Sequence, residues 1–255
     1  TYGADTFMNI YLTLIGIGTG NPEHLTLQAI RAMNAQDLIL IPHKGAGKDD
    51  LAQLRRGICN KVITNAETQI VEFELPVRNE ATQNYRARVD DWHDEIADVW
   101  QTAIDAHGDA KRVGLLVWGD PSLYDSTLRI AARLNPAPQI EVIPGITSLQ
   151  ALTAAHATVL NEIGAPFIVT TGRRLRDEGW PTGVDTVAIM LDAGGSFDSI
   201  DPTGVHIWWG AYVGMKEQIV IEGSLSKVAA QIKETRAKAR ADHGWIMDIY
   251  LLRKG

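Results

Sequence analysis

Apolar residues gather in short β-rich runs along the chain, and the segments between them repeat apolar positions every three or four residues. The first run, residues 10–17 (IYLTLIGI), ends in glycines and is typical of a strand buried on both faces. Such runs predict strands at residues 10–17, 37–41, 69–75, 112–118, 139–143, 167–171, 186–191, 205–209, 218–222 and 245–252. Helical spacing predicts helices at residues 24–34, 48–59, 80–107, 122–134, 146–159 and 224–240.

The order of these elements changes along the chain. Up to residue 118 strands alternate with helices, which predicts an α/β layer around a mostly parallel sheet. Between residues 167 and 209 the predicted strands follow one another with little helix between them, which indicates a mixed sheet. We therefore expect two α/β domains, residues 8–118 and 119–255, with the boundary near residues 119–126.

Charge and composition exclude several classes of protein. The 255 residues include 24 Lys and Arg against 31 Asp and Glu, a net charge of −7. A general nucleic-acid binder usually presents a basic face, so we expect no nucleic-acid partner. No apolar run approaches the roughly 18 residues that a membrane span requires, so we expect no membrane partner.

Cysteine and histidine usage argues against covalent or metal cross-links. Cys59 is the one cysteine, which excludes an intrachain disulfide, and its helical pattern is more typical of a buried spacer than of a nucleophile. The histidines are scattered and there is no cysteine pair, so we expect no metal. Met8 is the expected native start, with residues 1–7 an added remnant; without an export signal, the chain is expected to be cytoplasmic.

Glycine-bearing turns follow three of the predicted buried strands. They are residues 16–22 (GIGTGNP), 118–123 (WGDPSL) and 142–148 (VIPGITS). In α/β sheets, ligands bind at this end of the strands. The first turn does not match the dinucleotide fingerprint G-x-G-x-x-G because position 21 is Asn, so a nicotinamide site is disfavoured.

Each turn also has a purely structural interpretation. The first is compatible with a plain tight turn. Asp120 can cap the helix that follows it, and Thr147 and Ser148 can serve either as helix caps or as donors to a ligand.

In this order and at these spacings, the turns resemble the motifs of the tetrapyrrole (corrin/porphyrin) methylase family. GIGTGNPEHLT is similar to the family's G-x-G-P-G-D-x-x-x-L-T, GDP at residues 119–121 to its G-D-P, and VIPGITS to its V-x-P-G-I-[ST]-[SA]. AIMLD at residues 188–192 and IVIEGSLSKVAAQI at residues 219–232 extend the resemblance, which spans residues 8–252. Thr19 and Asn21 depart from the family's Pro and Asp, so the family's acidic side chain is missing at position 21, while the glycines remain.

The resemblance implies two α/β domains with an active-site trough between them, a homodimer, and a small-molecule tetrapyrrole substrate. It implies methyl transfer from S-adenosylmethionine, with S-adenosylhomocysteine as product, to a carbon of a corrin precursor. Residues 43–59, 76–93 and 207–214 are most similar to the members that methylate C1 of precorrin-5 and release acetate. By position it implies cofactor contacts from Thr19, Trp118, Gly119, Asp120, Leu123, Thr147, Ser148, Leu191 and Ala211.

Methyl transfer from a sulfonium needs alignment more than acid or base, so the absence of a catalytic triad is expected. Release of acetate would be helped by a base, because water must attack the acetyl carbonyl. Our candidates for this base are, in order of preference, Asp120, Tyr124 and His43. Arg173, Arg174 and Arg176 are the candidates for binding substrate carboxylates; the alternative is an ordinary solvated loop. His43, Lys44 and Lys48 form a second, weaker basic cluster.

Several other functions stay open at this stage. Within the family they are another precorrin methylase, the uroporphyrinogen enzyme, diphthine synthase, and a ribosomal-RNA ribose methyltransferase, which the acidic composition disfavours. Outside it they are a nicotinamide-dependent dehydrogenase and a non-catalytic tetrapyrrole carrier. Affinity for S-adenosylmethionine separates the methylases from both.

Overall fold

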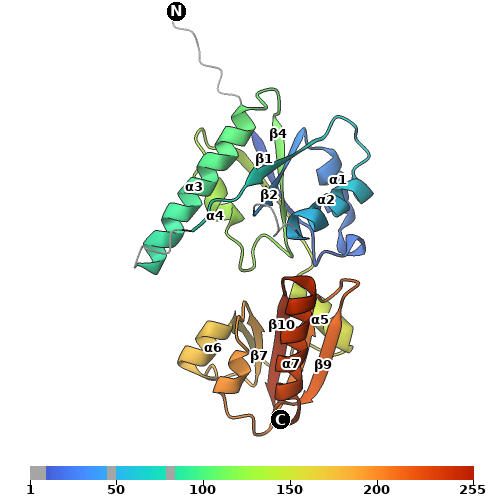
Figure 1. Ribbon diagram of the computed structural model, residues 1–255, viewed down its shortest axis with the longest axis vertical. Helices are drawn as coiled ribbons and strands as arrows, with labels where there is room; N and C mark the ends of the chain where they lie inside the picture. The colour runs from blue at the N-terminus through green and yellow to red at the C-terminus, as the bar shows by residue number, and fades with distance from the viewer. Residues whose placement is uncertain (1–9, 45–49, 79–83) are drawn as a thin grey trace, which may run out of the picture. The chain divides into compact units, whose positions relative to one another are not determined.

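A five-stranded sheet, parallel throughout, organises the first part of the chain in the order β3-β2-β4-β1-β5. Figure 1 shows this computed structural model, which describes residues 10–44, 50–78 and 84–255. The strands are β1 (Tyr11–Gly16), β2 (Leu38–His43), β3 (Gln69–Glu74), β4 (Arg112–Val117) and β5 (Gln139–Ile143). The helices are η1 (Pro22–His24), α1 (Leu27–Asn34), α2 (Asp50–Val62), α3 (Tyr85–Asp105) and α4 (Thr127–Ala131).

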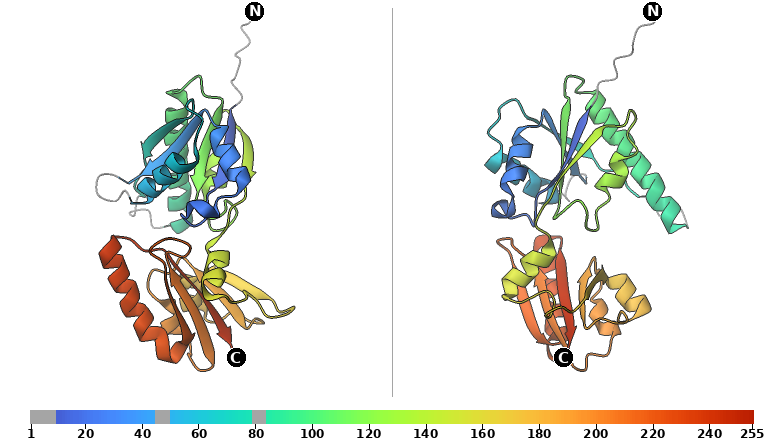
Figure 2. Two further views of the ribbon diagram at one scale, coloured as in Figure 1. Left: turned by 90° about the vertical axis from the view of Figure 1, so that its right-hand side faces the viewer. Right: turned by 180° about the vertical axis from the view of Figure 1, so that it is seen from behind.

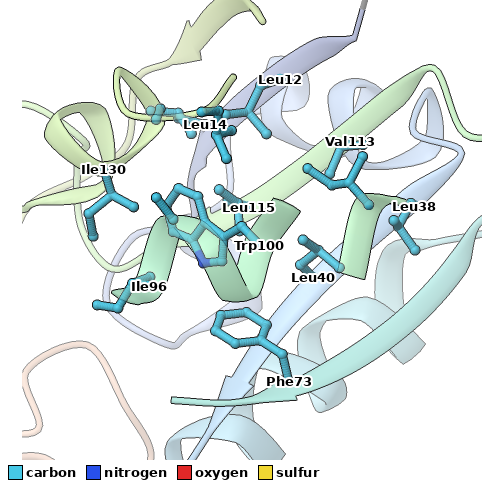
Figure 3. Close-up of a cluster of buried hydrophobic side chains, with 14 of the residues drawn as sticks. Leu12, Leu14, Leu38, Leu40, Phe73, Ile96, Trp100, Val113, Leu115 and Ile130 are labelled. Carbon is cyan, nitrogen blue, oxygen red and sulfur yellow. The ribbon is translucent and has the colours of Figure 1, made fainter. Parts of the chain in front are cut away.

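Helices cover both faces of this sheet, with α1 and α2 on one face and α3 and α4 on the other (Figure 1). Successive strand residues point to opposite faces. Leu12 and Leu14 therefore pack in the cluster that contains Trp100 of α3, which Figure 3 shows, and Ile15 and Ile17 pack in the cluster beneath α1 and α2. Burial on both faces explains why these strands read as continuous apolar runs.

A mixed five-stranded sheet organises the rest of the chain, in the order β6-β7-β10-β8-β9. Figure 2 shows this part of the chain in two further views, coloured from yellow to red. β6 and β7 are parallel and the other neighbours antiparallel, so the predicted fold class, a parallel sheet followed by a mixed one, is confirmed. The strands are β6 (Phe167–Thr171), β7 (Thr186–Met190), β8 (Val205–Ala211), β9 (Ile219–Ser224) and β10 (Asp248–Lys254). The helices are α5 (Ser148–His156), α6 (Gly172–Glu178), η2 (Ser196–Ser199) and α7 (Leu225–His243).

The two compact units meet in the sequence between Ile146 and Thr147, later than the boundary expected at residues 118 and 119. The reason is β5, which pairs in parallel with β1 and so keeps residues 119–143 in the first unit. Pairing across a sheet depends on which edge is open, and the order of elements along the chain does not reveal that edge.

Local side-chain chemistry explains where the helices differ from the prediction. The helix expected at residues 122–134 is reduced to α4, because Tyr124 has a φ of +48° and Asp120 and Asp125 accept from the backbone N–H two residues on. Residues 172–178, for which no helix was predicted, form α6, which Thr171 caps. Among the residues described, no helix is both long and apolar enough to cross a membrane.

Candidate functional site

The glycine turns converge at the carboxyl edge of the parallel sheet. Gly18 and Gly119 exchange backbone hydrogen bonds, with N···O distances of 3.2 and 2.7 Å. Gly145 lies against both neighbouring turns: a Cβ built on it would stand 2.0 Å from the Gly119 carbonyl oxygen and 2.9 Å from the Gly16 carbonyl carbon. The glycines of the three turns thus form one backbone junction in the first unit, although more than a hundred residues separate Gly16 from Gly145.

Asp120 joins the second and third turns through its side chain. Its Oδ2 accepts from the Gly145 backbone N–H at 2.9 Å, and its Oδ1 accepts from the Ser122 N–H at 2.8 Å and the Ser122 hydroxyl at 2.5 Å. Burial raises the pKa of Asp120, but these hydrogen bonds from Ser122 and Gly145 outweigh it and hold the pKa below its ordinary value. Both oxygens are already occupied, so the carboxylate acts here as a clamp between two turns.

Trp118, which comes just before that clamp, keeps a buried polar atom without a partner. Its indole Nε1 forms no hydrogen bond with any residue that the structure describes. The guanidinium carbon of Arg55, on α2, lies 4.9 Å from the centre of the Trp118 ring. An unpaired buried N–H is costly, so it marks a place where an acceptor is expected. Sequence reasoning missed Arg55, because its helical position gives no hint of a contact with residue 118.

The other predicted residues of the first unit lie around this edge. Thr19 is buried, and its hydroxyl is 2.8 Å from His24 Nδ1, so it braces the first turn. Leu123 donates its N–H to the Asp120 carbonyl, and Tyr124 is exposed at a left-handed φ. His43 is half-buried at the end of β2, on the same edge of the sheet. Lys48 lies outside the described residues, and Lys44 is exposed.

Thr147 and Ser148 begin α5 in the second unit. The Thr147 hydroxyl accepts from the Leu149 N–H at 3.2 Å, and Gln150 completes a capping box with the Thr147 backbone. The Thr147 side chain therefore forms the helix cap, which is one of the two roles that the sequence left open for it. Ser148 is half-buried.

Leu191, just after β7, and Ala211, the last residue of β8, differ in how far they are exposed to solvent. Leu191 follows β7 with a φ of +53°, and 65% of its surface is exposed. An apolar side chain held in the left-handed region and exposed to solvent is strained, and such strain clusters at ligand sites. Ala211 is fully buried, while the next residue, Tyr212, has a φ of +50°.

The arginines proposed for substrate carboxylates lie on α6 rather than on a loop. Arg174 forms a bidentate pair with Glu178, with N···O distances of 2.9 and 2.8 Å, and this hydrogen bond lowers the pKa of Glu178. Arg176 pairs with Asp177 at 3.2 Å. Arg173 is exposed on the same helix. The guanidinium fork of Arg174 and the Nε of Arg176 are thus engaged by neighbours within the helix.

The described part of the chain contains no cluster of side chains suited to bind a metal ion. No group of three His, Cys, Asp or Glu side chains there lies together as metal binding would require. Cys59 is a buried free thiol, and burial raises its pKa to about 11. A thiol in this state is a poor nucleophile, in keeping with a spacer in the core.

Comparison with known families and proteins gives one consistent result. A family model described as Tetrapyrrole (Corrin/Porphyrin) Methylases matches residues 11–229. Among curated proteins, Precorrin-6A synthase (deacetylating) of Sinorhizobium sp is 48% identical over 249 residues, which cover 96% of this chain and 95% of that protein.

Solved structures agree with this result. A cobalamin synthesis related protein, CobF, from Corynebacterium diphtheriae matches with a TM-score of 0.81 and 35% identity, covering 96% of this chain and 99% of that one. Uroporphyrin-III C-methyl transferase from Thermus thermophilus, complexed with S-adenyl homocysteine, matches with a TM-score of 0.60 and 19% identity, covering 95% and 92%. At that identity the second match shows the fold alone.

Proposed function

This chain belongs to the tetrapyrrole (corrin/porphyrin) methylase family, and from that premise we propose that it methylates C1 of precorrin-5 with S-adenosylmethionine and releases acetate, giving precorrin-6A. The observation that carries this proposal is the 48% identity to a precorrin-6A synthase over almost the full length of both proteins. The junction of glycine turns at the sheet edge supports it from the structure, because α/β sheets bind ligands there.

The residues at the sheet edge fit S-adenosylmethionine by their chemistry. Turns built from glycine leave main-chain groups open to adenine, ribose and carboxylate. We assign Thr19, Trp118, Gly119, Asp120 and Leu123 to cofactor binding in the first unit. In the second unit the cofactor-binding assignments are Thr147, Ser148, Leu191 and Ala211.

Methyl transfer requires little acid–base catalysis from the residues of this chain. S-adenosylmethionine supplies a methyl group on a good leaving group, and the enamine carbon of a corrin precursor is already nucleophilic. The protein's part is to hold the two in line and exclude water, which can contribute about 7–11 kcal/mol at best.

Release of acetate needs a further step. Water adds to the acetyl carbonyl, the bond from that carbon to the macrocycle breaks, and its electron pair passes to the macrocycle. Asp120 has both oxygens engaged and a lowered pKa, so we assign it a positioning role. Tyr124, exposed just after that turn, and His43, at the end of β2, are the remaining candidates for moving the proton.

Replacing Asp120 with asparagine tests this division of roles. One oxygen becomes an NH2 group, which cannot accept from Gly145 or Ser122, so the two turns should loosen. We expect a lower melting temperature, S-adenosylhomocysteine binding about 10-fold weaker, and methyl transfer and acetate release reduced together. Calorimetry and product quantification by mass spectrometry measure these; Ser122→Ala, which removes one donor only, should show a smaller change. Normal methylation with acetate release abolished would instead make Asp120 the base.

Assembly and location are further proposals. We propose a cytoplasmic homodimer acting on a free small molecule, without a metal. The family resemblance supports the dimer, and the lone buried Cys59 suits a reducing compartment. Sedimentation of the purified protein measures the oligomeric state directly.

The proposed reaction is tested by incubating the protein with S-adenosylmethionine and precorrin-5 and analysing the products by mass spectrometry. We expect one methyl group gained and one acetate released per turnover. Methyl transfer without acetate would keep the family and reject this reaction. No S-adenosylmethionine turnover with any precorrin or with uroporphyrinogen would reject a methylase function in corrin synthesis.

A further inference from the structure

Arg55 is the positively charged residue that the structure places against the second glycine turn. It extends from α2 to the end of β4, where its Nε donates to the Leu116 carbonyl at 3.2 Å. Its guanidinium carbon lies 4.9 Å from the centre of the Trp118 ring. These contacts hold the Arg55 guanidinium beside Trp118, which directly precedes Gly119 and Asp120.

The charge of Arg55 is not neutralised by a partner. Among the residues that the structure describes, no carboxylate lies within 4.0 Å of its guanidinium nitrogens, and its Nη atoms form no hydrogen bond. Asp125 is the carboxylate whose charge acts on Arg55, and its Oδ1 accepts from the Thr127 N–H at 2.7 Å. Burial lowers the pKa of Arg55 to about 10, against the opposing effects of Asp125 and Cys59, so the group still carries its charge at neutral pH.

Trp118 adds a second unsatisfied donor at the same place. Its buried Nε1 has no acceptor in the described part of the chain. A half-buried charge without a carboxylate partner and an unpaired buried N–H both favour an anionic acceptor at this place. The Nη groups of an arginine match the two oxygens of a carboxylate in particular.

We infer that Arg55 and the indole N–H of Trp118 form a carboxylate-binding pair at the end of β4, which takes a side-chain carboxylate of the tetrapyrrole substrate. This inference rests on the proposed function for the identity of the substrate. It answers a need of that function, since a chain of net charge −7 requires a local cation to hold a polycarboxylate. The amino-acid carboxylate of S-adenosylmethionine has the same chemistry, and the experiment separates the two sources.

The neighbouring Arg56 provides a matched control. It lies on the same helix and forms an ion pair with Glu72 of β3. Arg55→Met and Arg56→Met make the same change of charge and size one residue apart, so a general electrostatic effect should appear in both. Arg55→Lys keeps the charge and loses the fork.

Binding is measured with three probes. They are S-adenosylhomocysteine, 5′-methylthioadenosine, which lacks the carboxylate, and uroporphyrin III, a stable tetrapyrrole polycarboxylate. Steady-state kinetics with precorrin-5 and melting temperature complete the set. We expect Arg55→Met to weaken uroporphyrin III and raise KM for precorrin-5 by about 10- to 100-fold, with Arg55→Lys intermediate and Arg56→Met close to wild type. The melting temperature should stay close to that of wild type, because the half-buried Arg55 has no carboxylate partner that the substitution would leave unpaired.

Each outcome decides the inference. Loss of S-adenosylhomocysteine affinity with 5′-methylthioadenosine unaffected would support the carboxylate pair and assign it to the cofactor. Equal affinities in Arg55→Met and Arg56→Met for all probes, or a lower melting temperature with unchanged affinities, would overturn it. If wild type fails to convert precorrin-5 while uroporphyrin III binding still depends on Arg55, the proposed reaction fails and the carboxylate pair stands.

Discussion

Gly145→Ala is expected to disrupt the site strongly, because the added methyl group has no room among the glycine turns. The new Cβ would lie 2.0 Å from the Gly119 carbonyl oxygen and 2.9 Å from the Gly16 carbonyl carbon. Both are backbone atoms of other turns, which cannot move aside as a side chain can. We expect a loss of about 3 kcal/mol or more in unfolding free energy. Because the displaced turns carry Trp118 and Asp120, S-adenosylhomocysteine affinity should fall at least about 10-fold.

Gly57 gives the matched control for this substitution. It lies on α2, and a Cβ there meets no atom within 4 Å. Gly57→Ala should therefore stabilise the protein by about 0.5–1 kcal/mol through helix propensity and leave ligand binding unchanged. Urea denaturation and calorimetry on both variants measure the two effects. Wild-type stability and affinity in Gly145→Ala would show that the three turns do not meet as described.

Removal of the Asp192 side chain should cause the largest loss of stability in the second unit. This buried carboxylate accepts from the Tyr250 hydroxyl at 2.6 Å, the Ser196 N–H at 2.6 Å, the Ser196 hydroxyl at 2.8 Å and the Gly194 N–H at 3.1 Å. Asp192→Ala leaves these donors unpaired in the interior, with an expected cost of about 3–5 kcal/mol. The loop that it fixes follows Leu191, so a proposed cofactor contact should be lost with it.

Tyr250→Phe and Asp201→Ala calibrate that result. Tyr250→Phe removes one of the donors and should cost about 1–2 kcal/mol, less than Asp192→Ala. Asp201 also accepts from a backbone N–H, that of Thr203, but is exposed to solvent, so its loss should have a smaller effect. Chemical denaturation orders the three variants. A larger effect for Asp201→Ala than for Asp192→Ala would refute the role given to the buried network.

The same carboxylate predicts a dependence of stability on acid. Burial raises the pKa of Asp192, but hydrogen bonds from Tyr250, Ser196 and Gly194 outweigh it, and the folded pKa is below its ordinary value. A lowered pKa means that the stabilisation is complete above the unfolded value of about 3.9 and is lost as pH falls through the folded pKa. Wild type should therefore lose stability below about pH 4, and Asp192→Asn, which has no such proton to bind, should show a shallower decline on denaturation curves.

The local sequence pattern was sufficient to predict the strands and the turns that follow them. An apolar run long enough for a strand, closed by glycine, can be recognised without knowing its neighbours, because burial on both faces and backbone freedom are properties of the segment itself. The cap at Thr147 was accessible for the same reason, because its own hydroxyl accepts from the Leu149 N–H at the start of α5.

What depends on distant partners was decided only in the tertiary structure. The pairing of β5 with β1, the clamp from Asp120 to Gly145, and the contact of Arg55 with Trp118 join residues far apart in sequence. In each case the stabilising contact forms only after the sheet has brought the two residues together, and the local sequence around neither residue predicts it. The sequence by itself therefore determined the strands, the family and the turns that follow the strands, while the fold decided which charged side chains are held in ion pairs and which, like Arg55, have no carboxylate partner among the described residues.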